Sequence, residues 1–85
     1  MSVTPEDIAG IRDALAAGRS AGELRASFPH LAWSQCDAED VDEEPLEAVG
    51  QIDIHLIDTR SHCVSLTTRA EDATGVLLAQ RRTAP

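Results

Sequence analysis

The chain has 85 residues, and its 15 acidic and 7 basic residues give it a formal net charge of −8. A chain of this length forms one domain and buries about two-thirds of its unfolded surface, which excludes a second domain and a large internal substrate cavity. The strong acidity argues against nucleic acid and anionic membranes as partners, because both would be repelled.

Residues 1–29 are predicted to form two helices. The stretch that begins at Thr4 supplies a hydroxyl cap, a proline in the first turn and an acid three residues on, a pattern typical of a helix start. Ser20 and Glu23 repeat the capping pattern for a second, short helix, which Pro29 ends. Apolar residues recur at helical spacing in both segments, so each helix has one face to bury.

A short strand and a long acidic loop are predicted next. The segment LAWSQC, residues 31–36, alternates weakly, with Trp33 on one side and Cys36 on the other. Residues 37–50 follow as an exposed loop, which Pro45 interrupts and in which a helical turn can form. The loop carries seven carboxylates: Asp37, Glu39, Asp40, Asp42, Glu43, Glu44 and Glu47. Without them the chain is almost neutral, so its negative charge is local.

A hairpin is the clearest predicted element, formed by QIDIHLID and TRSHCVSLT. Apolar and polar residues alternate in its first strand, so Leu56 is expected to face the core and His55 to face solvent. A three-residue loop over residues 59–61 places Leu56 opposite Val64. In this register the apolar residues of both strands lie on one face of the sheet. A shift by one residue would place the apolar residues of the two strands on opposite faces.

The end of the chain completes the predicted fold. Thr68 and Glu71 form a third capping pattern for a short helix that Gly75 ends, and residues 76–80 are interpreted as a last strand. The fold class is α+β: two N-terminal helices packed on a small antiparallel sheet of three to four strands, with a short helix before the last strand. Residues 1–85 form a single domain, with the helical pair in 1–29 and the sheet in 30–85.

Four residues raise the alternative of a metal-handling protein: Cys36, His55, His62 and Cys63. In the predicted register His55 and Cys63 are diagonal neighbours on the outer face, and Cys36 joins them if the first strand lies beside the hairpin. The spacing is unlike that of zinc motifs, and neighbouring residues of a strand such as His62 and Cys63 point to opposite sides. In the competing interpretation both cysteines are half-buried apolar groups, His62 pairs with Asp58, and His55 is solvated. No resident cofactor is predicted.

Other chemistries fit the sequence poorly. A cysteine nucleophile needs a base beside it in a cleft, and the spacing provides none for Cys36 or Cys63. The chain has no nucleophile elbow and no glycine-rich phosphate loop. An EF-hand loop beginning at Asp37 would require glycine where Asp42 stands. We therefore expect a protein that is not an enzyme.

The expected compartment is the cytoplasm. The first residues lack a secretory signal, and no apolar stretch is long enough to span a membrane. Two cysteines do not form a disulfide framework, so free thiols are expected, while a single bridge between Cys36 and Cys63 stays open.

Three ordered segments, LRASFPHLAWSQCDAEDV, IHLIDTRSHCVSLT and DATGVLLAQ, resemble those of a small bacterial family without assigned activity. The resemblance covers most of residues 23–80. We associate that family with gene neighbourhoods for nitrogen fixation. The resemblance implies an accessory protein of nitrogenase assembly, protection or electron supply, and it assigns no functional residue.

The sequence thus favours a small accessory module that binds a protein with a basic surface through its acidic loop. Trp33 is the candidate apolar anchor if its side chain is exposed. An open sheet edge and a small core also leave homodimerisation open.

Overall fold

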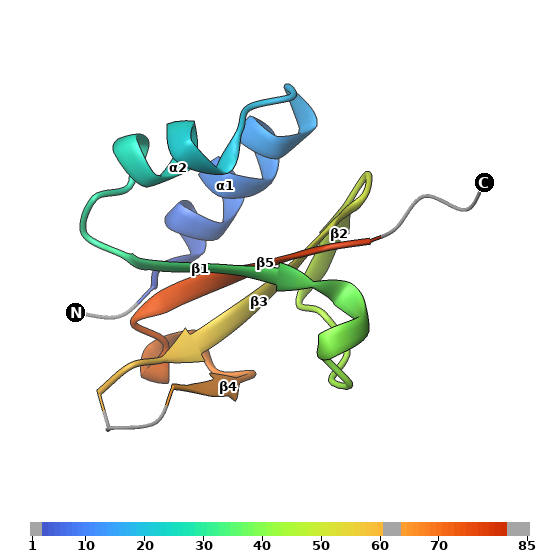
Figure 1. Ribbon diagram of the computed structural model, residues 1–85. Coiled ribbons are helices and arrows are strands. Elements are labelled where there is room, and N and C mark those ends of the chain that lie inside the picture. Colours follow the sequence, from blue (N-terminus) through green and yellow to red (C-terminus); the bar gives the residue numbers. More distant parts are fainter. Residues whose placement is uncertain (1–2, 61–63, 82–85) are drawn as a thin grey trace.

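The computed structural model describes residues 3–60 and 64–81, and it confirms the α+β class that the sequence predicts (Figure 1). Two α-helices cover one face of a five-stranded sheet. Within the described part of the chain, neither helix is long and apolar enough to cross a lipid bilayer.

Both helices begin with the reciprocal caps that the sequence predicts. The helices are α1 (Pro5–Ala16) and α2 (Ala21–Ser27). The Thr4 hydroxyl accepts the Asp7 amide N–H at 3.1 Å, and the Asp7 carboxylate accepts the Thr4 amide N–H at the same distance. Ser20 and Glu23 make the same exchange at 3.2 Å. Gly18 follows α1 with a φ of 85°, which glycine adopts without strain, and so reverses the chain between the helices.

The sheet is mixed rather than purely antiparallel. Its strands are β1 (Ala32–Asp37), β2 (Glu47–Val49), β3 (Ile52–Asp58), β4 (Ser65–Thr67) and β5 (Gly75–Gln80). The last strand lies between β1 and β3, and it runs parallel to β1 and antiparallel to β3. Both β2 and β4 pair with the other edge of β3. The predicted antiparallel sheet of three to four strands is therefore right in class and wrong in strand number and in the direction of β1.

The hairpin register differs from the prediction by three residues. Leu56 pairs with Thr67 and Ile57 with Leu66, where Leu56 had been expected opposite Val64. Because the shift is odd, it moves each β4 side chain to the opposite face of the sheet. The Thr59 N–H donates to the Thr74 hydroxyl at 2.9 Å, which holds the end of β3 near β5. Because β3 ends at Asp58 and β4 begins at Ser65, the connection is longer than the predicted three-residue loop.

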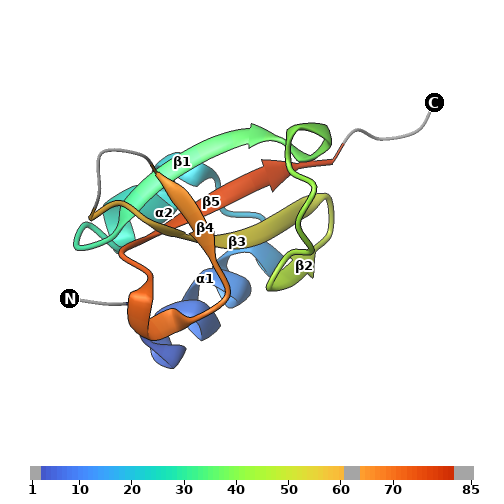
Figure 2. The same ribbon diagram turned by 90° about the horizontal axis from the view of Figure 1, so that it is seen from below.

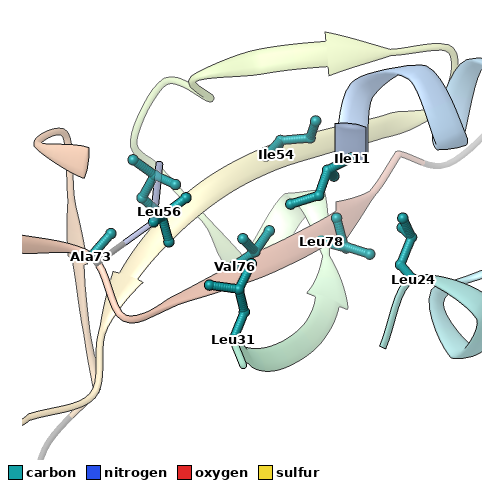
Figure 3. Packing of buried hydrophobic residues seen from close by; sticks show 9 residues of the cluster. Ile11, Leu24, Leu31, Ile54, Leu56, Ala73, Val76 and Leu78 are labelled. Carbon is teal, nitrogen blue, oxygen red and sulfur yellow. The ribbon is translucent and has the colours of Figure 1, made fainter. Parts of the chain in front are cut away.

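The core lies between the helices and the sheet (Figure 3). Ile11 points toward Ile54 and Leu78, and it is fully buried. The buried cluster consists of Val3, Ile11, Leu24, Leu31, Ile54, Leu56, Ala73, Val76 and Leu78. Burying several side chains of this size contributes roughly 2 kcal/mol each, which makes this layer the main source of stability.

The acidic loop crosses the sheet on the side away from the helices (Figures 1 and 2). It leaves β1 at one edge through a 3₁₀ turn, Ala38–Asp40, and returns at the other edge as β2. The helical turn that the sequence left room for is thus present, whereas β2 lies inside residues 37–50, which had been predicted as loop throughout.

A 3₁₀ turn, Ala70–Asp72, stands where the short helix before the last strand was predicted. It lacks the predicted capping box, because the Glu71 carboxylate pairs with Arg69 and the turn has no side-chain cap. Gly75 begins β5 instead of ending a helix. The last strand itself is confirmed.

Gly75 is predicted to be intolerant of any side chain. A Cβ placed there would lie 2.7 Å from the Ala32 Cβ and closer still to the Ala32 carbonyl oxygen. We expect Gly75→Ala to lower the free energy of unfolding by about 1–3 kcal/mol, measured by urea denaturation, because β1 and β5 would be forced apart. The control is Gly22→Ala in α2, where a Cβ meets only the Ser20 hydroxyl at 3.8 Å. This substitution is expected to raise stability by about 0.5–1 kcal/mol. Equal effects of the two would contradict the β1–β5 contact.

Acid is predicted to weaken the end of β3. Hydrogen bonds from the Arg60 guanidinium and backbone lower the pKa of Asp58 from 3.8 to about 2. A carboxylate whose pKa is depressed in the folded state stabilises that state above its unfolded pKa, and the contribution is lost as the pH falls toward the folded value. Asp58→Asn should therefore reduce the dependence of the thermal midpoint on pH across this window. Asp13→Asn, at an exposed helix position, should leave the dependence as it is in the parent.

Candidate partner-binding site

A cavity of about 350 Å³ opens between the acidic loop and β4. Leu46, just before β2, donates its N–H to the Ile54 carbonyl at 2.8 Å, while Thr67 of β4 pairs with Leu56. The edge of β3 therefore passes from one partner strand to the next at His55, and the cavity lies at this junction. Its walls are Glu43, Glu44, Pro45, Leu46, His55, Leu56, Leu66, Thr67 and Thr68.

His55 is buried, contrary to the prediction that it faces solvent. Only 5% of its surface is exposed, and its side chain lies on the face of β3 away from the helices. That face is covered by the loop at one end and by β4 at the other (Figure 2). Within the described residues the imidazole makes no hydrogen bond. Its nitrogen atoms keep some solvent exposure, because the one fully buried side-chain polar atom without a hydrogen bond in this part of the chain belongs to Asp53.

Asp53 lies on the same face of β3 and is 7% exposed. Its Oδ1 atom is 2.8 Å from Nε of Arg81, which follows β5, but the N–H does not point at it well enough for a hydrogen bond. The ion pair keeps a buried carboxylate from being isolated, which would be costly. Asp53 is thus a structural charge, and it does not line the cavity.

Most of the acidic loop's carboxylates are not neutralised by the described arginines. Glu39, Asp40, Asp42, Glu43 and Glu44 are exposed and make no ion pair with an arginine of the described residues. Five of the six described arginines pair with acids other than these five: Arg12 with Glu47 at the end of the loop, Arg19 with Glu23, Arg60 with Asp58, Arg69 with Glu71 and Arg81 with Asp53. The negative potential that the sequence concentrates in the loop is therefore left for an outside charge.

The structure separates the metal candidates that it describes. β5 lies between β1, which carries Cys36, and β3, which carries His55, so two strand spacings of roughly 10 Å in total separate their backbones. Across residues 3–60 and 64–81, no three His, Cys, Asp or Glu side chains are grouped to hold a metal ion. His62 and Cys63 lie outside the described residues. The condition on which Cys36 would join the set, that β1 lies beside the hairpin, is not met. Metal handling stays an alternative predicted from the sequence.

Cys36 is a free, half-buried thiol. Burial, followed by the charges of Asp40 and Asp37, raises its pKa. A raised pKa keeps the thiol protonated, which makes it a poor nucleophile and a poor metal ligand at neutral pH. The geometry thus assigns Cys36 to packing at the end of β1.

Trp33 also packs against the protein. Its side chain is half-buried on the helix side of β1, its ring lies 6.3 Å from that of Phe28, and its indole N–H donates to the Phe28 carbonyl at 3.1 Å. The exposed large apolar side chains of the described residues are Leu46, at 42%, and Val64, at 62%. Leu46 lies within the acidic loop itself. The sequence pattern did not indicate it as an exposed apolar side chain.

A comparison with protein families places the chain. One family model, described as a family of unknown function (DUF6129), matches residues 7–81. The chain belongs to this family. No curated protein and no solved structure matches it. Membership in DUF6129 agrees with the expected likeness to a family without assigned activity, and it leaves the geometry of the site as the basis for assigning a function.

We expect Cys36 to react slowly with thiol reagents. In a Cys63→Ser background, its alkylation rate should be lower in the folded protein than in urea, since burial disfavours the thiolate. Asp40→Asn should raise the rate in the folded protein by removing a neighbouring negative charge. The control Glu44→Gln changes a loop acid that does not affect this thiol, and it should leave the rate unchanged. Identical rates for Asp40→Asn and the parent would contradict the assigned cause.

Proposed function

We propose that the chain is a non-enzymatic accessory protein that binds a partner with a basic surface through its acidic loop. The observation that carries the proposal concerns five exposed loop carboxylates, Glu39, Asp40, Asp42, Glu43 and Glu44. They form no ion pair with an arginine of the described residues, while five of the six described arginines pair with other acids. A cytoplasmic location fits this role.

Electrostatic steering is the expected mechanism. Several like charges on one exposed segment attract a basic surface over about 8 Å at physiological salt, and they raise the association rate more than the affinity. Holding these charges together disfavours the isolated protein slightly, because each close pair repels. A positive partner relieves that repulsion.

Leu46 provides the apolar contact that such an interface needs. It lies next to Pro45 and two glutamates, and 42% of its surface is exposed. Protein interfaces combine an apolar centre with a polar rim. Leu46 surrounded by loop acids has that arrangement on a small scale.

The physiological setting that we propose is nitrogen fixation. Its support is the resemblance carried by the three segments within residues 23–80. An acidic accessory protein suits such a role because assembly or protection of a larger enzyme requires reversible contacts, and charge-steered contacts form rapidly and weaken with salt.

Neutralising the loop should slow binding. Partners are captured from an extract of the native host, and the association rate of the captured basic protein is measured by surface plasmon resonance. For Asp42→Asn/Glu43→Gln/Glu44→Gln, we expect a rate about tenfold lower at low salt and a weaker salt dependence.

The matched control is Glu6→Gln/Asp13→Asn/Glu71→Gln, which removes the same charge from exposed positions outside the loop. It should change the rate by much less. A rate that neither the loop variant nor added salt alters would defeat the proposal, as would equal effects of the two triple variants.

A further inference from the structure

The cavity beside β3 has three chemical features that point to one kind of occupant. Leu46, Leu56 and Leu66 give it hydrocarbon walls, and Glu43 and Glu44 bring carboxylates to it. The third feature is His55, which is only 5% exposed and makes no hydrogen bond within the described residues, while its nitrogens keep some exposure. A ligand that donates a hydrogen bond to this imidazole gains more than it would at an open surface, because hydrogen bonds are stronger in largely apolar surroundings.

The geometry points to a single lysine or arginine side chain of the partner protein as the occupant of this cavity. Such a side chain has a hydrocarbon stem and a cationic head that only donates hydrogen bonds. The stem matches the leucine walls, and the head matches the carboxylates of Glu43 and Glu44 and the acceptor nitrogen of the His55 imidazole. This inference rests on the proposed function, and it adds an anchoring residue to what is otherwise diffuse attraction.

The cavity is large enough to take one long side chain. Its volume of about 350 Å³ is at the lower end of the roughly 300–1,000 Å³ that ligand pockets span. Its position also fits, because the acids that attract the partner at long range and the acids that line the cavity belong to one continuous loop. Glu39 and Asp40 contribute only to the field, whereas Glu43 and Glu44 contribute to both.

Small probes test the inference without the partner. Nα-acetyl-lysine N-methylamide and its arginine counterpart are titrated into the ¹⁵N-labelled protein, with Nα-acetyl-norleucine N-methylamide as the uncharged control. We expect saturable shift changes at the amides of His55, Leu66 and Thr67 for a basic probe, and at least about fivefold weaker binding for norleucine, which corresponds to about 1 kcal/mol.

Variants then separate the cavity from the loop. Thr68→Trp places a large ring at the cavity while keeping every carboxylate, and it should abolish probe binding; Leu46→Trp, at an exposed position, is the second blocking variant if the first fails to fold. Glu43→Gln/Glu44→Gln should weaken binding of the basic probe about fivefold. The matched control Glu39→Gln/Asp40→Asn removes the same charge from loop positions that do not line the cavity, and it should change binding less than twofold.

Three results would overturn the inference: no saturable shifts with either basic probe, equal binding of norleucine, or equal weakening by the two charge variants. Each can occur while the association rate still depends on the loop charges and on salt. Failure of the cavity and failure of the proposed function are therefore distinguishable.

Discussion

The parallel pairing of β1 with β5 is the constraint on which the remaining arrangement depends. It places β1 at one edge of the sheet, while β2 lies at the other edge beside β3. The chain between them must therefore cross a face of the sheet, and the helices already cover one face. The acidic loop is that crossing segment, and its backbone passes across the side of the sheet away from the helices.

Much of the fold could be predicted from local signals. The caps at Thr4 and Ser20 define where the helices begin, and the β-branched and apolar residues of β3 and β5 identify the central strands. The direction of β1 could not be predicted, because nothing in residues 31–36 indicates which strand they pair with. The hairpin register was wrong because β4 begins only at Ser65, later than a tight three-residue loop would place it. The end of β3 is instead held by a contact between residues distant in the sequence, Thr59 and Thr74.

The candidate site was predictable in part. The charge of the loop is visible in the composition, and its exposure follows from it. The burial of His55 was not deduced, because the alternation of apolar and polar residues in β3 suggests that one face of the strand is exposed to solvent. A signal was present: the run VLLA in β5 is apolar at every position, which is typical of a strand buried on both faces, and its neighbour β3 shares that environment.

Two strands of three residues each share the second edge of β3. This arrangement affects how the protein behaves at high concentration. A long, unpaired edge invites strands of other molecules to add to it and so promotes fibre formation. Here the edge is covered in two short pieces, and the gap between them is bordered by Glu43 and Glu44. Neither piece is long enough to template a cross-β stack, and the acids at the gap repel a second copy of the same segment.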